Sequence, residues 1–395
     1  MGALAQTIAV ARSGPKARRG AILITIKPDS SSQSPPATRL LRRKTQRQIQ
    51  RPARARMPSM TNHHAPAGRS CSTRLVWRAG LLIGACQLAP AAMRSQAIST
   101  VGIERAVHTD AYWRFTYEND FFGATDRYYT QGVHLEVVHP RLRLPGVSRL
   151  LFAPKNVRTR FGVAFEDDGY TSSDLKQATI PVGDHPYAGT KQLRTFVIAN
   201  DSARARVTSS SLTIGLIGPG AGGREIQTYI HRRTGNTIPM GWTHQIRNDL
   251  ILNYEVTGEQ RVRRWGNIAQ VSAHGVARLG SYQSGLTSGA TLQLGRLPAL
   301  PQRSRSASRL LYAYVKPQLQ FVGYDATLQG GVFNRASPYT IASRDVSRGV
   351  YRHYMGLVYR SDSRFVEFFQ AYSSRTFRTG RPHRTGGILF GVNRP

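Results

Sequence analysis

The chain has 395 residues and a formal net charge of +34, and such an excess of basic residues suggests a polyanionic partner. The first 97 residues hold 17 of the 55 basic residues, 1 of the 21 acidic residues and both cysteines, Cys71 and Cys86, so the remaining chain has no thiol for a disulfide, a thiolate nucleophile or a Cys-ligated zinc. No run after residue 97 reaches the roughly 18 apolar residues of a membrane-spanning helix, which excludes a protein of several such helices.

The leader has two parts. Residues 1–56 are rich in Arg, Ser and Pro and lack hydrophobic periodicity, which predicts a disordered or mis-annotated N-terminal extension. Residues 57–97 have the order of an export signal, with basic residues before the apolar run Ala79–Leu88 and small residues after it. A lipoprotein signal ending at Cys86 is the alternative. The sequence therefore predicts that residues 98–395 form the domain of an exported protein.

From Tyr112 onward, runs of about ten residues are separated by clusters of Gly, Pro, Ser, Asn and Asp. Leu311 and Ala313, for example, alternate with Tyr312 and Tyr314, which is the period of two of a β-strand. In an exported chain this pattern predicts an all-β fold, a transmembrane antiparallel β-barrel of about twelve strands; a soluble β-sandwich or lipocalin-like barrel is the alternative. The runs are 112–118, 129–139, 159–167, 189–200, 206–217, 250–262, 265–279, 286–296, 310–324, 349–360, 364–375 and 385–393.

One segment has the pattern of a short helix, in an extracellular loop. Gly222–Gly235 begins and ends with glycine and lies in the long connection between the fifth and sixth runs. Gln227 and His231 are four residues apart, so a helix places both on one face, where the imidazole could deprotonate a water. The plainer interpretation is a surface histidine. If the first run climbs from the periplasm, the connections after runs one, three and five open at the same outer rim.

Two further polar clusters lie in the other connections at that rim. Asn119 and Asp120 end the first run and Thr130 begins the second. A carboxylate beside an amide oxygen suits Ca²⁺, although Asn and Asp are also ordinary turn residues. The cluster after the third run contains Lys176 and Asp184, and by itself it is best interpreted as a solvated loop with a Pro turn.

Three other catalytic arrangements are disfavoured by the sequence. The glycines of 218–223 lack the Lys-Ser/Thr ending of a phosphate loop. No Gly-x-Ser-x-Gly motif supports a serine nucleophile, and no His-Glu-x-x-His motif accompanies His231 to support zinc.

Together and in this order, the three clusters resemble the outer-membrane lipid A 3'-O-deacylase family. The resemblance extends from Tyr112 to the C-terminus, with its motifs concentrated between residues 112 and 250. The shared features are Asn119-Asp120, Asp126-Arg127, Tyr129-Thr130-x-Gly132, Tyr170-Thr171, Asp184-x-Pro-Tyr-Ala-Gly189, Gly218-Pro219-x-Ala221-Gly222-Gly223-x-Glu225-x-Gln227-x-x-x-His231, and Trp242-x-x-Gln245.

The resemblance implies a twelve-stranded barrel that uses Ca²⁺ to hydrolyse the ester-linked 3'-acyloxyacyl chain of lipid A. It makes His231 the general base and gives active-site roles to Gln227, Asn119, Asp120, Thr130 and Lys176. Asn119 and Asp120 would hold the Ca²⁺. The sequence departs from the family pattern at Thr237, where the pattern has a Glu six residues after the histidine.

The implied partners are lipopolysaccharide and the lipid of the bacterial outer membrane, and we expect a monomer that binds no nucleic acid. Lipid A phosphates would then meet basic residues such as Arg224, Arg232, Arg233 and Lys176. Thr237 favours the alternative of a catalytically silent barrel, or one with phospholipase or other esterase activity. Net charge alone favours a soluble protein that binds a polyanion.

Overall fold

A computed structural model describes residues 111–297 and 309–394 of the chain. The expected N-terminal extension 1–56 and export signal 57–97 lie outside these residues. The barrel expected within 98–395 begins at Ala111.

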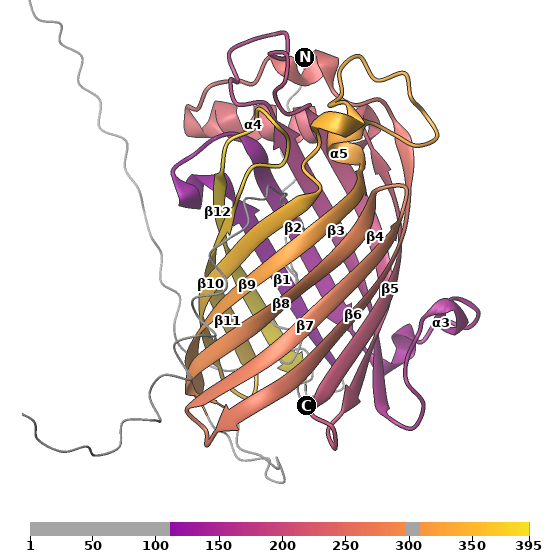
Figure 1. Cartoon of the computed structure of the whole chain (residues 1–395), viewed down its shortest axis with the longest axis vertical. Coiled ribbons are helices and arrows are strands. Elements are labelled where there is room, and N and C mark those ends of the chain that lie inside the picture. Colours follow the sequence, from indigo (N-terminus) through magenta and orange to yellow (C-terminus); the bar gives the residue numbers. More distant parts are fainter. Residues whose placement is uncertain (1–110, 298–308, 395) are drawn as a thin grey trace, which may run out of the picture. The chain divides into compact units, whose positions relative to one another are not determined.

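The described chain forms a closed barrel in which each strand pairs antiparallel with its sequence neighbours and β1 pairs with β12 (Figure 1). The twelve expected strands are confirmed. The strands are β1 Ala111–Asn119, β2 Tyr128–Val138, β3 Arg158–Thr171, β4 Ala188–Asp201, β5 Arg206–Ile217, β6 Asp249–Trp265, β7 Ala269–Gly280, β8 Gln283–Arg296, β9 Leu310–Asp325, β10 Gly349–Arg360, β11 Arg364–Ser373 and β12 His383–Arg394.

One expected boundary falls in the wrong strand. The seventh run was expected to begin at residue 265, but Trp265 ends β6 and β7 begins at Ala269. The turn between them contains Gly266, whose φ of 52° lies in the left-handed region that glycine adopts readily. A turn of three residues leaves too weak a gap in the alternation to be recognised in the sequence.

The alternation of side chains separates the two faces of the wall. In β9, Leu311, Val315 and Leu319 are exposed on the outside, whereas Tyr312 and Tyr314 are buried inside. This arrangement is that of a membrane barrel, whose outer residues meet lipid. Among the described residues, no helix is long and apolar enough to cross a membrane.

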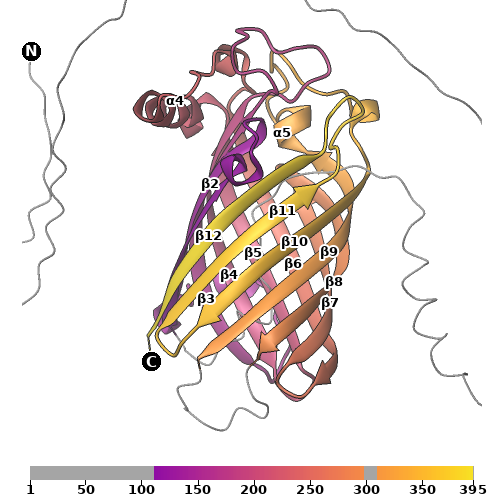
Figure 2. The same ribbon diagram turned by 90° about the vertical axis from the view of Figure 1, so that its left-hand side faces the viewer.

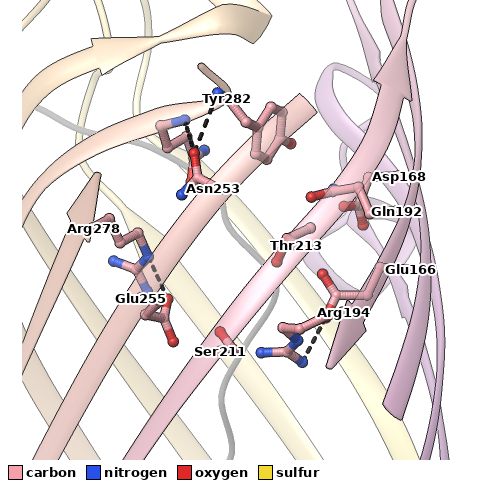
Figure 3. Close-up of a pocket in the computed structure, with 11 residues that line it drawn as sticks. Glu166, Asp168, Gln192, Arg194, Ser211, Thr213, Asn253, Glu255, Arg278 and Tyr282 are labelled. Carbon is pink, nitrogen blue, oxygen red and sulfur yellow. Dashed lines mark hydrogen bonds and ion pairs between the residues drawn. The ribbon is translucent and has the colours of Figure 1, made fainter. Parts of the chain in front are cut away.

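The interior is polar, and the charges around one cavity in it include two ion pairs (Figure 3). The cavity has a volume of about 60 Å³, and at its lining Arg194 lies 2.5 Å from Glu166 and Arg278 lies 2.6 Å from Glu255. Pairing is needed because an isolated charge in such an enclosed site would be costly. The residues of β3 to β7 that line this cavity face inward. Because side chains alternate along a strand, the residues next to them in the sequence face outward.

Long connections gather at one rim of the barrel, which we call the site rim. They include the connections from β1 to β2, from β3 to β4 and from β5 to β6, which were expected to share a rim. The expected helix 222–235 is α4 in the last of these connections. Two α-helices of one turn were not expected: α3 at the opposite rim and α5 at the site rim (Figure 1). The helices are α3 Val147–Leu150, α4 Gly223–Thr234 and α5 Ala326–Gln329, with 3₁₀ turns η1 Asp120–Gly123, η2 Pro140–Leu142, η3 Pro219–Ala221, η4 Gly241–His244 and η5 Ser343–Asp345.

Candidate functional site

Helix α4 lies outside the barrel at the site rim (Figure 2). Its first residue, Gly223, packs against Gly189, which is on the outward face of β4: a Cβ added at Gly189 would lie 3.1 Å from the Gly223 Cα. A Cβ added at Gly223 would lie 2.8 Å from the Trp242 ring. Two glycines therefore allow the helix to approach the outer wall closely.

Lys191 fastens the start of α4 to the wall. It lies two residues after Gly189 on the same outward face, and its Nζ is 2.5 Å from a carboxylate oxygen of Asp167 on β3. The same Nζ donates a hydrogen bond of 2.5 Å to the Ala221 carbonyl, just before the helix. One ammonium group thus joins β3, β4 and the connection that carries the helix.

Gln227 links the helix to two other parts of the chain. Its side chain is buried, and its Oε1 accepts a 2.8 Å hydrogen bond from the Trp242 indole. Its Nε2 lies 3.3 Å from the Thr130 hydroxyl on β2. The donors and acceptors of these partners fix the orientation of the amide.

A β-bulge directs Thr130 toward α4. The register between β2 and β3 shifts between Tyr129 and Gln131, so Thr130 has no cross-strand partner there. Bulges commonly redirect a side chain in this way. The Thr130 hydroxyl lies 3.4 Å from an oxygen of Asp126 and completes a chain of polar contacts from Trp242 through Gln227 to this carboxyl group.

His231 is buried one turn after Gln227 on the same face of α4, as its spacing predicted. Its Nδ1 lies 2.6 Å from the Thr237 carbonyl oxygen. A carbonyl only accepts hydrogen bonds, so Nδ1 carries the proton and Nε2 has a free lone pair when the ring is neutral. The geometry thus selects the tautomer that a general base at Nε2 requires.

Asp126 is an acidic group that interacts electrostatically with His231. Burial raises the pKa of Asp126, while the positive charge of His231 acts in the opposite direction and lowers that pKa. Asp126 was part of the expected motif but was not among the expected site residues. A carboxyl group near the imidazole can stabilise the imidazolium form during proton transfer.

At the same rim, Asn119 ends β1 and Asp120 begins the turn η1. The Asn119 Oδ1 accepts a hydrogen bond of 2.7 Å from the Phe121 amide, and the Asp120 Oδ2 accepts one of 2.6 Å from the Arg127 amide. Asp120 is buried, and burial, together with the charge of Asp126, raises the pKa of Asp120 to about 9. Without a nearby cation this carboxyl group is therefore mainly protonated at neutral pH.

The chemistry of these donors fits Ca²⁺. Asn119, Asp120 and Asp126 offer hard oxygen ligands, and a cation would offset the mutual repulsion of the two carboxylates. Each carboxylate retains lone pairs beyond those used in its hydrogen bonds. Within residues 111–297 and 309–394, no group of three or more His, Cys, Asp or Glu is placed to hold a metal ion, so amide, hydroxyl, carbonyl or water oxygens would have to complete the coordination.

The structure therefore brings most of the expected site residues to the same region of the site rim, but not all of them. Gln227, Thr130 and His231 lie on or against α4, and Asn119 and Asp120 share the rim with them. Lys176 is exposed, and within the described part of the chain its hydrogen bond runs from its backbone amide to Asp174. That lysine does not join the polar contacts around Gln227.

Besides the role of Asp126, sequence reasoning missed two contributions at this site. Lys191 lies in the middle of a strand and carries no motif, so nothing local separated it from other basic residues. Thr237 takes part through its carbonyl group, for which the residue type gives no signal. The missing Glu at position 237 therefore leaves the hydrogen bond to His231 Nδ1 intact.

The barrel is similar to LpxR from Salmonella typhimurium, with a TM-score of 0.58, 17% sequence identity, and coverage of 72% of this chain and 100% of that chain. It also matches the β domain of the Bordetella autotransporter BrkA, with a TM-score of 0.37, 8% identity, and coverage of 72% of this chain and 98% of that chain. No curated protein matches the sequence.

The family comparison covers most of the chain. The model of the family described as outer membrane protein LpxR matches residues 81–393, which include every described strand almost to its end. With the closed barrel, this match places the protein in the bacterial outer membrane. The chain belongs to the LpxR outer membrane protein family.

Proposed function

We propose that this protein hydrolyses the ester-linked 3'-acyloxyacyl chain of lipid A, with His231 as the general base. The observation that carries the proposal is the hydrogen bond from His231 Nδ1 to the Thr237 carbonyl, which leaves Nε2 as the proton acceptor. Membership of the LpxR family supports the same activity. The position of α4 on the outward face of the wall supports a lipid substrate, because a membrane lipid approaches a barrel from that side.

The reaction needs one base and no covalent intermediate with the protein. His231 Nε2 takes a proton from water as the water oxygen attacks the ester carbonyl carbon. The tetrahedral intermediate then expels the 3' oxygen of the sugar, which receives the proton from the imidazolium. The products are the free acyloxyacyl acid and a lipid A with a 3' hydroxyl group, so all atoms are accounted for.

The neighbours of His231 hold the parts of the site together. Asp126 stabilises the transient imidazolium through its negative charge. Gln227, held by Trp242 and Thr130, fixes the helix to β2 and acts as a positioning residue. Such fixation matters because small displacements of a base reduce its efficiency strongly.

We further propose that Asn119 and Asp120 hold a Ca²⁺ ion. When bound, the ion would supply a Lewis acid for the ester carbonyl oxygen. The raised pKa of Asp120 supports this assignment, because a buried carboxyl group beside another acid gains a partner when a cation binds. Lys176, exposed in the next connection, stays a candidate for contact with the lipid A head group.

The direct test is a mass spectrum of lipid A from an outer membrane that contains the full chain. Wild type should remove the 3'-linked acyl groups when Ca²⁺ is present, and His231→Ala should lower the rate by roughly 10²- to 10⁴-fold, the usual contribution of a general base. His244→Ala is the matched control, because His244 is a half-buried histidine at the same rim whose ring bonds to the Ala178 carbonyl and not to the residues around Gln227.

A second candidate is a barrel that is catalytically silent or cleaves a different ester, such as a phospholipid. Two observations favour it: Thr237 brings no carboxylate to the site, and the described residues offer no third acidic ligand beside Asp120 and Asp126. Unchanged lipid A from a correctly inserted wild-type barrel would support this candidate. Release of fatty acid from phospholipid vesicles, lost in His231→Ala, would identify the esterase.

A further inference from the structure

Among the connections that the structure describes throughout at the rim opposite α4, one is unusually long. Residues 139–157 join β2 to β3, whereas the connections 202–205, 266–268 and 361–363 at the same rim have only three or four residues. Short turns are typical of the periplasmic rim of an outer-membrane barrel. We name residues 139–157 the wall segment, because they return to the outside of the barrel instead of turning directly into the next strand.

Hydrogen bonds fix the wall segment to strands far from its ends. The Phe152 amide donates to the Tyr254 hydroxyl over 3.0 Å, and this hydroxyl donates to the Leu150 carbonyl over 2.9 Å. The Ser210 hydroxyl donates to the Phe152 carbonyl over 2.8 Å. Ser210 is on β5 and Tyr254 on β6, and both alternate with residues that line the interior cavity, so both face outward. The segment thus reaches from β2 to β6 along the outer wall.

Burial and ring contacts support this path. Val197 and Ala199 face outward on β4, yet they are only 1% and 2% exposed, whereas Leu193 on the same face is 54% exposed. Arg143 of the segment lies over the ring of Phe161, an outward residue of β3, at 5.6 Å. Phe161 pairs with Val197, which pairs with Ser210, so these contacts follow one row across the wall.

The surface that the wall segment presents is both apolar and basic. Leu150 and Phe152 are 62% and 54% exposed although they are large apolar residues. Arg141, Arg143, Arg149 and Lys155 are also exposed, and no acidic residue occurs between positions 139 and 158. Figure 1 shows α3, within the segment, standing outside the barrel beside β5 and β6. Apolar side chains with flanking cations are typical of segments at a membrane interface.

We propose that the wall segment binds anionic phospholipid of the periplasmic leaflet. Leu150 and Phe152 would insert among the acyl chains while the four cations contact the phosphate groups. The charge of the segment selects this occupant, because an anionic lipid complements four cations that have no acidic residue within the segment. The rim opposite α4 is the periplasmic one, so the lipid bound here belongs to the leaflet opposite the one that holds lipid A. This inference does not depend on the proposed enzymatic activity.

The test uses a fluorescent probe on the segment and a matched probe on a short turn of the same rim. Ala153→Cys and, as the control, Ala203→Cys are each introduced into the full chain together with Cys71→Ser and Cys86→Ser, and are labelled with the environment-sensitive dye NBD. Ala203 is exposed in the turn between β4 and β5. The proteins are reconstituted into phosphatidylethanolamine vesicles that contain an equal fraction of brominated phosphatidylglycerol or brominated phosphatidylcholine, whose bromines quench a nearby dye.

We expect the probe at position 153 to be quenched, and to be quenched about twofold more by brominated phosphatidylglycerol than by brominated phosphatidylcholine, since the cations concentrate the anionic lipid. The probe at position 203 should be quenched little by either. In the fourfold variant R141Q/R143Q/R149Q/K155Q the preference at position 153 should disappear, with retention of the compact barrel checked by its heat-dependent shift on a gel.

Three results would overturn the proposal. Quenching at position 153 as weak as that at position 203 would mean that the segment does not meet lipid. Equal quenching by both brominated lipids in the unaltered segment would remove the role of the cations. A blue-shifted emission at position 153 without quenching, accompanied by disulfide-linked dimers of the unlabelled cysteine variant, would assign the surface to a second copy of the chain.

Discussion

Two segments leave the barrel and return to its outer wall, one at each rim, and they are held in different ways. The α4 connection, residues 218–248, is fixed through side chains: the buried Gln227 bonds to Trp242 and Thr130, and the half-buried Lys191 bonds from the wall to the Ala221 carbonyl. The wall segment is fixed mainly through its backbone, which bonds to two hydroxyl groups of the strands.

The way in which each segment is attached corresponds to the side chains that it exposes or buries. Around α4 the polar side chains turn inward, where their mutual bonds fix their orientation, as proton transfer requires. In the wall segment the backbone is fixed, while the side chains of Arg141, Arg149, Leu150, Phe152 and Lys155 are exposed. Exposed side chains on a fixed backbone can follow a fluid lipid surface. We infer that the first arrangement suits chemistry at one atom, whereas the second suits binding of many similar molecules.

The largest effect should come from separating α4 from the wall with Gly223→Val. A Cβ at this position would lie 2.8 Å from the Trp242 ring and 3.1 Å from Gly189, so the helix has to move. A displacement of about 1 Å can lower a rate by about 10²-fold, and we expect at least that loss of deacylation in lipid A mass spectra. Gly258→Val on β6 is the control, because a Cβ there meets nothing among the described residues. Equal activity of both variants would contradict tight packing of α4.

Asp120→Asn should change how stability depends on pH. The pKa of Asp120 is raised from 3.8 to about 9 by burial, so the folded protein holds this proton while the unfolded chain releases it between these values. The free energy of unfolding of wild type therefore falls as pH rises, by up to about 1.4 kcal/mol per pH unit, and levels off above pH 9. In the presence of a chelator, the advantage of the variant in unfolding temperature should grow from pH 5 to pH 9.

The same measurement of unfolding temperature, repeated with Ca²⁺ in place of the chelator, tests the proposed metal site. Bound Ca²⁺ favours the ionised carboxylate, so it should raise the unfolding temperature of wild type, and more at pH 8 than at pH 5. Asp120→Asn should respond less. A calcium response equal in the two proteins would place the ion elsewhere, and a pH-independent difference between them would show that the Asp120 carboxyl group is not buried as described.

Lys191→Met should loosen α4 without displacing it. The variant loses the contacts with Asp167 and Ala221. We expect kcat to fall by about tenfold with little change in KM, because the helix still docks through its glycines but positions His231 less accurately. Stability should change by less than about 1 kcal/mol, since the Lys191 side chain is 37% exposed and the ion pair is screened.

A lysine-to-methionine substitution in the wall segment is the matched control for Lys191→Met. Lys155→Met removes an exposed lysine of the wall segment and should leave deacylation unchanged. If both lysine variants lowered kcat equally, the two segments would not differ in the way proposed.

The smallest effect should follow from Tyr254→Phe, which removes two hydrogen bonds to the backbone of the wall segment. Each is worth about 1 kcal/mol, so the segment should open several-fold more often while the barrel stays folded. Trypsin cleavage after Arg149 and Lys155 measures this opening. Tyr359→Phe on the outer face of β10 is the control and should leave the cleavage rate unchanged.

Sequence patterns and structure agree best where the pattern is local. Alternation of side chains predicted the twelve strands, and the spacing of Gln227 and His231 placed both on one face of the expected helix. The structure buries both residues. The alternation did not locate the turn after Trp265, because three residues interrupt it too briefly. It also gave no indication of α3 and α5, whose single turns are too short for a helical period.

The sequence by itself determined the barrel, the face of α4 that holds His231, and the rim at which the three polar clusters meet. These follow from periodicity, because each residue's side of a strand or helix depends only on its neighbours in the chain. Only the tertiary structure decided that the Thr237 carbonyl selects the histidine tautomer, that the bulge directs Thr130 to Gln227, and that residues 139–157 lie along the outer wall. These contacts join positions set by the pairing of distant strands, which no local pattern encodes.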